Sequence, residues 1–189
     1  EYVHLGRTRD DAAGEVYDKI AKYLNIGYPG GPLIDNRTKD ANPVRFHFRG
    51  GLEDQENFDF SFSGLKTAVI RSYNQLPENS KKDEKLINDL LASFQQSVVR
   101  TLWKKTFRAI QKTGIRTVSL GGGVAANSYL RSYFLQKGAR YKVKIFLPSP
   151  TLCTDNAAMI GSCGSFYFSK GKISPLDLEP NPRLNLGES

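Results

Sequence analysis

Residues 118–131 read VSLGGGVAANSYLR, and this stretch decides how the rest of the chain is interpreted. Three consecutive glycines, Gly121–Gly123, separate an apolar run typical of a strand from a segment with helical spacing. Glycine lets backbone approach a ligand without a Cβ in the way, and it also permits a plain tight turn. The stretch does not fit the dinucleotide fingerprint G-x-G-x-x-G, and because no lysine follows the glycines it does not fit a Walker loop either. Ligand contact and a tight turn both remain open interpretations.

The segments around the glycines predict an α/β fold. A helical stripe that starts at Leu86 ends at Gly114, and strands are expected on both sides of the next helix. Helix, strand, helix, strand, helix in this order predicts a parallel α/β unit. The expected elements are strands at 3–5, 57–64, 117–120 and 143–147, and helices from about Asp10 to Gly27, at 65–73, 86–113, 127–136 and from Asp155 onward, with a charged loop at 76–85.

Composition narrows the class of protein. The chain has 189 residues and is 39% hydrophobic, which is enough to bury a core as one domain or two small ones. No apolar run approaches the ~18 residues of a membrane span, so no membrane association is expected. Cys153 and Cys163 form no C-x-x-C motif, so neither a disulfide framework nor a zinc site is indicated. We expect a cytoplasmic protein.

Positive charge is concentrated in one segment. The formal net charge is +8, and no acidic residue occurs between Asp89 and Asp155. Within this span a basic residue recurs every four positions, which places like charges on one helix face. Such a stripe either meets phosphates or forms a solvated helix face. Its members are Arg100, Lys104, Arg108 and Lys112.

Two polar residues stand where a predicted strand meets the next helix. Asn127 is either a helix cap or an amide that faces a ligand. Asp155 is either an N-cap or a metal ligand, and the spacing does not decide between these roles. In an open parallel sheet, the strand carboxyl ends carry the ligands, so both residues are expected at one cleft.

Three carboxylates share a face of the first predicted helix. Asp11, Glu15 and Asp18 stand at i, i+4 and i+7, away from the apolar stripe. An exposed helix tolerates them with nearby lysines, whereas a nucleotide cleft would offer them to ribose hydroxyls.

Five blocks of the chain, taken in order, resemble the TsaD family of tRNA adenosine threonylcarbamoyltransferases, formerly described as O-sialoglycoprotein endopeptidases. The resemblance covers nearly the whole chain, and five blocks in order are far more specific than any single motif. The blocks are LGRTRDDAAGEVYDKIAKYLNIGYPGGP, FDFSFSGLKTAV, SFQQSVVRTLWKKTFRAI, LGGGVAANSYLR and CTDNAAMIG.

The resemblance implies an actin-like, sugar kinase and Hsp70-type ATPase fold, of which residues 1–189 would form the second, C-terminal lobe. Because the chain opens on Glu1 rather than methionine, we expect a piece of a larger protein whose N-terminal lobe is absent. The implied activity moves a threonylcarbamoyl group from threonylcarbamoyl-adenylate to the adenosine next to the tRNA anticodon. The isolated half is expected to be inactive by itself.

The resemblance also implies site residues. It assigns nucleotide contacts to Asp18, Gly31 and Asn127, with Asp11, Glu15, Gly122 and Gly123 as weaker candidates, and assigns one ligand of an iron or zinc ion to Asp155. The other metal ligands would be two histidines of an H-x-x-x-H motif in the absent half. His4 and His47 lie 43 residues apart and do not form that motif.

The implied partners are tRNA, the N-terminal half, a TsaB-like paralogue and a TsaE-like ATPase. The basic span, through Arg100, Lys104, Arg108 and Lys112, is then a candidate tRNA-facing surface. Two other classes stay open, namely a non-catalytic nucleotide-binding or scaffold lobe and the metallo-glycoprotease of the older description. A sugar kinase of the same fold would be distinguished by phosphorylation of a small polyol.

Overall fold

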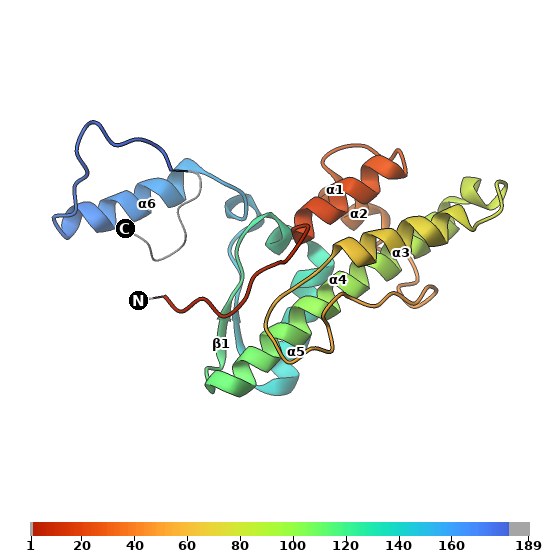
Figure 1. The fold of residues 1–189 in the computed structure, drawn as a ribbon, viewed down its shortest axis with the longest axis horizontal. Coiled ribbons are helices and arrows are strands. Elements are labelled where there is room, and N and C mark those ends of the chain that lie inside the picture. The colour runs from red at the N-terminus through yellow and green to blue at the C-terminus, as the bar shows by residue number, and fades with distance from the viewer. Residues whose placement is uncertain (1, 182–189) are drawn as a thin grey trace.

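The computed structural model describes residues 2–181, which form an α/β arrangement of helices with a small parallel sheet at one side. Figure 1 shows the longest helix, α4, running through the middle of this arrangement. The helices are α1 (Ala13–Tyr23), α2 (Gly30–Arg37), α3 (Ser63–Asn74), α4 (Glu84–Thr113), α5 (Ser128–Tyr141) and α6 (Ala157–Ser169), the 3-10 turns are η1 (Ser80–Lys82), η2 (Gly123–Ala126) and η3 (Pro150–Leu152), and the strands are β1 (Thr117–Ser119) and β2 (Lys144–Phe146).

Helix α4 is defined at both ends by its caps. The Asp83 carboxylate accepts hydrogen bonds from the backbone N–H groups of Lys85 and Leu86, which satisfies the first turn. Gly114 ends the helix with a φ of 73°, a left-handed conformation that glycine adopts without strain. The predicted stripe and its end at Gly114 are therefore confirmed.

Two apolar cores lie along α4. Helices α1, α2 and α3 pack on its first half through a cluster that includes Val16, Leu65 and Phe94. Helix α5 packs on its second half, where Trp103 of α4 meets Phe134 with ring centroids 5.2 Å apart. Because α4 contributes to both cores, it fixes α1 and α2 relative to α5.

Strands β1 and β2 pair in parallel, with Thr117 opposite Lys144 and Ser119 opposite Phe146. Helix α5 forms the crossover that a parallel pair requires. The sequence predicts that this helix ends before Gly138, but it continues to Tyr141. Gly138 is needed inside the helix for close packing, since a Cβ there would lie 2.6 Å from a side-chain carbon of Ile145.

The prediction of strands at 3–5 and 57–64 is wrong. Residues 3–5 form neither a strand nor a bridge within residues 2–181, and the segment 57–64 makes only isolated bridges, Phe60 with Thr8 and Ser61 with Gly51. Two backbone hydrogen bonds, from Arg9 N to Phe60 O and from Phe60 N to Arg7 O, close the first contact. The alternating phenylalanines therefore mark an extended segment whose Phe62 is buried, without a neighbouring strand to form a ladder.

A helix absent from the sequence prediction follows the GYPGGP segment. Helix α2 starts at Gly30, directly after Pro29, so the prolines and glycines mark a helix start rather than a simple break. Helix α1 is also shorter than predicted, beginning at Ala13.

Helix α6 extends away from the rest of the chain, as the blue helix in Figure 1 shows. Its sequence, AAMIGSCGSFYFS, contains no charged residue, yet it buries none of its residues. Ile160 and Phe168 are 65% and 70% exposed. Across residues 2–181, no helix combines the length and the apolar character needed to cross a membrane.

Candidate functional site

A cleft of about 910 Å³ lies where β1 ends, between α1, α2 and the glycine corner. This is the carboxyl end of a parallel strand, the position at which ligands bind in open α/β sheets. The cleft brings together Asp18, Gly31, Gly122, Gly123 and Asn127, which the sequence placed at one site. Asp11, Glu15 and Asp155 are not among the residues that line it.

The glycine corner presents backbone to the cleft. Leu120 N donates to Phe146 O at 3.0 Å, which fixes the start of the corner to β2. Gly122 has a φ of 81°, so only glycine fits there without strain. Within residues 2–181, the N–H groups of Gly121 and Gly122 donate no hydrogen bond. They are therefore available to a ligand carrying phosphate or carbonyl oxygens.

Asn127 is a helix cap buried beneath the cleft. Its Oδ1 accepts from Leu130 N at 2.9 Å, and its Nδ2 donates to Gln95 Oε1 at 2.8 Å. Gln95 Nε2 in turn donates to the Thr38 hydroxyl at 3.0 Å. The capping interpretation of Asn127 is confirmed, and the side chain joins α5, α4 and the end of α2 in one buried polar network.

Asp18 and Gly31 form the opposite side of the cleft. Asp18 Oδ1 accepts from Gly30 N at 2.7 Å, which ties α1 to the start of α2. A Cβ on Gly30 would lie 2.5 Å from Tyr17 O, so this glycine serves packing. A Cβ on Gly31 would meet nothing within 4 Å, so Gly31 borders open space in the cleft.

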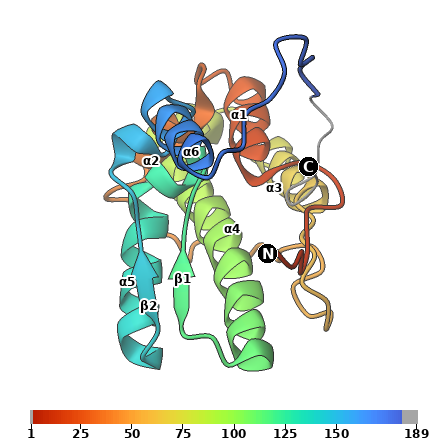
Figure 2. The same ribbon diagram turned by 90° about the vertical axis from the view of Figure 1, so that its left-hand side faces the viewer.

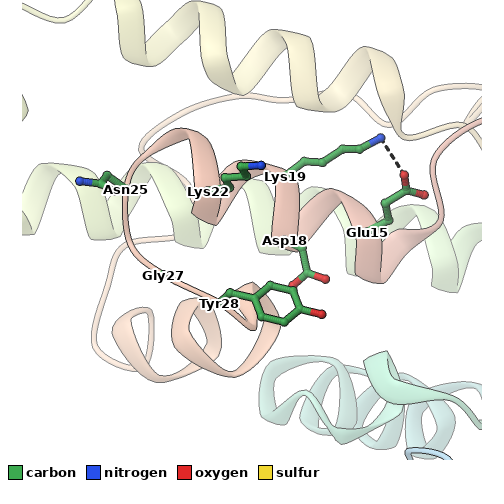
Figure 3. Close-up of a pocket in the computed structure, with 7 residues that line it drawn as sticks. All are labelled: Glu15, Asp18, Lys19, Lys22, Asn25, Gly27 and Tyr28. Atoms are coloured by element: carbon green, nitrogen blue, oxygen red, sulfur yellow. Dashed lines mark ion pairs between the residues drawn. The ribbon is translucent and has the colours of Figure 1, made fainter.

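A smaller hollow of about 550 Å³ adjoins Asp18 on the surface of α1. Figure 3 shows the ring of Tyr28 beside Asp18, and the Lys19 side chain reaching along α1 to Glu15. That ion pair is 2.7 Å long. Asp18 is therefore the carboxylate shared by the small hollow and the large cleft.

The three carboxylates predicted on one helix face have separate roles. Asp11 lies before α1 and pairs with Lys19 at 2.7 Å and Lys66 at 2.8 Å. Hydrogen bonds from Lys19 and then Lys66 lower the pKa of Asp11 from 3.8 to about 2. The Glu15 carboxylate accepts from Ala12 N, which satisfies a backbone N–H group at the start of α1. Asp11 and Glu15 thus hold α1 in place, and Asp18 alone of the three lines the large cleft.

The sequence analysis missed two cleft residues. The Asp35 carboxylate accepts from the backbone N–H and the hydroxyl of Ser128, both at 2.9 Å, and so caps α5 from α2. The Tyr17 side chain is buried in the cleft wall, and its hydroxyl finds no hydrogen-bond partner among residues 2–181. Burial raises the pKa of this hydroxyl. No local signal distinguishes Tyr17 from the apolar residues of its helical stripe.

Asp155 is exposed, one residue after Thr154, which lines the cleft. It is not a helix cap, because Asn156 fills that role by accepting from Met159 N at 2.9 Å. Helix α6 accordingly begins at Ala157 rather than at Asp155. Among residues 2–181, no group of three or more His, Cys, Asp or Glu side chains is placed to hold a metal ion. The described residues therefore do not fit a complete metal site.

Acidic and carbonyl groups of the chain itself engage the predicted basic stripe. Lys104 pairs with Asp54 at 2.5 Å and with Glu53 at 3.5 Å, and Arg100 lies 3.8 Å from Glu53. Arg108 donates to the carbonyl of Gln55. The stripe thus binds the segment 53–57 along α4, which explains how like charges are tolerated on one face.

Lys112 lies outside this arrangement, over the ring of Phe58 at 5.3 Å. Between Lys104 and Arg108, the buried Lys105 donates from Nζ to three oxygens of Gln55 and Asn57. Burial lowers the pKa of Lys105. Three of the four predicted stripe residues are therefore already in contact with the chain's own segment 53–57.

Comparison with known proteins gives one consistent result. The family model TsaD, described as tRNA N6-adenosine threonylcarbamoyltransferase, matches residues 1–162. Curated relatives with that same name include proteins of Clostridium kluyveri, 45% identical over 97% of this chain, and Caldicellulosiruptor bescii, 46% identical over 98% of it. A relative from Synechococcus is 45% identical over the full chain.

The chain spans about half the length of these relatives. It covers 54% of the Clostridium kluyveri and Caldicellulosiruptor bescii proteins and 50% of the Synechococcus protein. The family match nevertheless extends from the first residue to within α6, so it includes every element around the cleft. Since the model match and the relatives agree on one name, the chain belongs to the TsaD family of tRNA N6-adenosine threonylcarbamoyltransferases.

Proposed function

We propose that the large cleft binds the adenylate part of threonylcarbamoyl-adenylate, and that the chain forms part of an enzyme that transfers the threonylcarbamoyl group to a tRNA adenosine. The observation that carries this proposal is the meeting of Asp18, Gly31 and Asn127 in one cleft at the carboxyl end of β1. These three residues come from α1, α2 and the start of α5, so only the folded chain assembles them.

Each of the three has a distinct role toward the nucleotide. Asp18 accepts from Gly30 N with Oδ1, and its other oxygen, which has no partner within residues 2–181, can accept a hydrogen bond from a ribose hydroxyl. Gly31 leaves room for the ligand because it has no side chain. Asn127 is fixed by its bonds to Leu130 and Gln95, so it holds the corner and α5 in place beside the ligand.

The glycine corner suits the phosphate of an adenylate. The free N–H groups of Gly121 and Gly122 are the kind of donors that bind anions where a strand meets a helix. In an acyl transfer these donors would keep the leaving adenylate in position. Asp155 is proposed as one ligand of an iron or zinc ion, with its other ligands outside residues 2–181, and we assign no step to that ion.

The finer fold proposed for the chain is the C-terminal lobe of an actin-like, sugar kinase and Hsp70-type ATPase fold. The family match supports this fold. The exposed apolar helix α6 fits a lobe that packs against another part, because large apolar patches mark interaction surfaces. The N-terminal half is its proposed partner, together with tRNA and with TsaB-like and TsaE-like proteins. A cytoplasmic location is proposed with them.

A second candidate function is a nucleotide-binding lobe without catalysis. Asp18, Gly31 and the glycine corner all lie in this chain, which spans about half of its relatives. Nucleotide binding can therefore persist where transfer does not. The two candidates differ in whether threonylcarbamoyl transfer to tRNA appears when the other half of a relative is added.

Gly31→Ala tests the proposed cleft. The new methyl group would have no atom of residues 2–181 within 4 Å, and alanine favours a helix over glycine, so stability is expected to stay the same or rise slightly. It would occupy ligand space, and adenine nucleotide affinity is expected to fall at least tenfold by titration calorimetry. Gly64→Ala is the matched control, because Gly64 also has open space around it but lies in α3, outside the cleft. Equal nucleotide affinity in the two variants would refute the assignment.

The transferase activity is tested with threonylcarbamoyl-adenylate whose threonine part carries a label. This compound and tRNA are supplied to the chain together with a polypeptide that spans the other half of the Clostridium kluyveri relative. Incorporation of label into tRNA that is lost in Asp18→Ala supports the enzyme. Nucleotide binding without incorporation in any combination supports the non-catalytic lobe instead.

A further inference from the structure

Six basic residues gather at the end of the sheet opposite the cleft. They lie in the α4–β1 turn, the α5–β2 turn and the adjoining ends of α4, α5 and β2. Figure 2 shows both turns at the same end of the molecule, at the lower edge of that view. We call this surface the basic end, and its members are Lys112, Arg116, Lys137, Arg140, Lys142 and Lys144.

The members of the basic end differ from the stripe on α4 in their partners. No carboxylate within residues 2–181 lies within ion-pair distance of any of them. All except the half-buried Lys137 are exposed. Charges left unneutralised on one surface raise the local potential and attract polyanions. The basic end is therefore the stronger candidate for an anionic partner than Arg100, Lys104 and Arg108.

Hydrogen bonds connect the two turns into one surface. The Arg116 guanidinium donates to Tyr141 O at 2.9 Å, and Lys144 N donates to Arg116 O at 2.8 Å. The Arg116–Tyr141 bond joins the α4–β1 turn to the end of α5. The Lys144–Arg116 bond continues the hydrogen bonding between β1 and β2. Arg116, Lys142 and Lys144 are thus held close together by backbone that has little freedom to move.

Aromatic rings lie beneath several of these cations. Lys144 Nζ is 4.6 Å from the ring centroid of Phe146, and the Arg140 guanidinium is 5.6 Å from that of Tyr141. Lys137 lies over Tyr133 in the same way, at 5.3 Å. Phe146 is 46% exposed, so part of its ring is open to an incoming group. Cations interleaved with accessible rings suit RNA, whose phosphates and unpaired bases use both.

We propose that the basic end binds the sugar-phosphate backbone of an RNA that also reaches the mouth of the cleft. This rests on the proposed function only in taking the RNA to be tRNA. Helix α5 runs from the cleft at Ser128 to the basic end at Tyr141, and its 14 residues span about 21 Å. An RNA that touches both places must be at least that long, so a folded tRNA meets the requirement and a mononucleotide does not.

The test compares two triple variants with the same change in charge. Arg140→Glu, Lys142→Glu and Lys144→Glu alter the basic end. Arg71→Glu, Lys82→Glu and Lys85→Glu alter α3, η1 and the start of α4, at the opposite end of α4 from the basic end. Affinity for tRNA is measured by fluorescence anisotropy at several KCl concentrations. The first variant is expected to bind at least tenfold more weakly, with a salt slope reduced by about 2 to 3. The second is expected to stay within twofold of the unmodified chain.

Lys142→Gly separates binding from folding. Lys142 has a φ of 55°, where glycine fits without strain, so this variant is expected to unfold at an equal or higher urea concentration. Its salt slope is nevertheless expected to fall by about 1, because one phosphate contact is lost. Circular dichroism is measured to check that each variant keeps its helices.

Equal tRNA affinity in the first triple variant and the unmodified chain would overturn the proposal, as would equal losses in both triple variants. Binding to phosphatidylserine vesicles that depends on the basic end, with tRNA binding unaffected, would assign the surface to a membrane instead. Adenine nucleotide binding is measured in parallel and is expected to be unchanged. A chain that binds no nucleotide but loses tRNA with the first triple variant would refute the cleft and retain the basic end.

Discussion

The carboxylate of Asp35 caps a helix that begins 93 residues later in the chain, since its Oδ2 accepts the backbone N–H of Ser128 at 2.9 Å. Asp35 Oδ1 accepts the Ser128 hydroxyl at the same distance. Asn127, the residue directly before α5, caps the same helix. Two side chains thus cap the first turn of α5, and the one from α2 ties α2 to the start of α5, where both elements line the cleft.

Asp35→Ala is expected to lower the free energy of unfolding by about 1 to 2 kcal/mol. The loss has two physical sources, the removed cap and the removed negative charge at a helix N-terminus. Urea unfolding measures it, with Asp40→Ala as control because Asp40 is exposed and lies beyond the end of α2. An Asp35 variant as stable as the Asp40 variant would show that the Ser128 contact adds nothing to folding.

Tyr17→Phe is expected to stabilise the chain by about 1 kcal/mol, because it removes a buried hydroxyl that has no partner within residues 2–181. The same change is expected to weaken adenine nucleotide binding, since a ligand in the cleft can supply the missing partner. Tyr23→Phe is the control, because the Tyr23 hydroxyl already donates to Asn74 at 2.9 Å outside the cleft. Unchanged stability together with unchanged nucleotide affinity would contradict this account.

Gly30→Ala is expected to destabilise the chain by about 1 to 3 kcal/mol, although Gly→Ala normally favours a helix. The new Cβ would lie 2.5 Å from Tyr17 O and 2.8 Å from Asp18 Cα, and backbone atoms cannot move aside cheaply. Thermal unfolding measures the loss. Gly31→Ala, one residue later, provides the comparison, and similar melting temperatures for the two would show that α2 is free to shift.

The sequence predicts the second half of this fold more accurately than the first. Helix α4, both strands and α5 are local patterns with clear ends, and Gly114 marks one of those ends. The residues before Gly64 are organised by contacts with distant parts of the chain. Lys105, for example, is buried against Gln55 and Asn57, and no period in the sequence indicates that contact.

The candidate site follows the same division. Asp18, Gly31 and Asn127 were identified by resemblance and meet in one cleft. Asp35 and Tyr17 were not predicted, because their roles depend on distant parts of the chain. Asp35 binds Ser128, 93 residues later, and the buried Tyr17 hydroxyl has no hydrogen-bond partner within residues 2–181. A stripe of like charges was also ambiguous in the sequence. The acidic residues that pair with it, Glu53 and Asp54, stand about fifty positions away.

The Asp11 ion pairs predict a pH dependence of stability. Lys19 and Lys66 hold the pKa of Asp11 at about 2, below its ordinary value of 3.8. The unfolded chain therefore binds this proton more tightly, and the stabilisation from Asp11 is fully present above about pH 4 and is lost as the pH falls toward 2. Urea unfolding of the unmodified chain and of Asp11→Asn is compared at pH 6 and pH 3. The difference between them is expected to shrink at pH 3, and a difference that stays constant would show that the carboxylate's charge does not stabilise the α1–α3 contact.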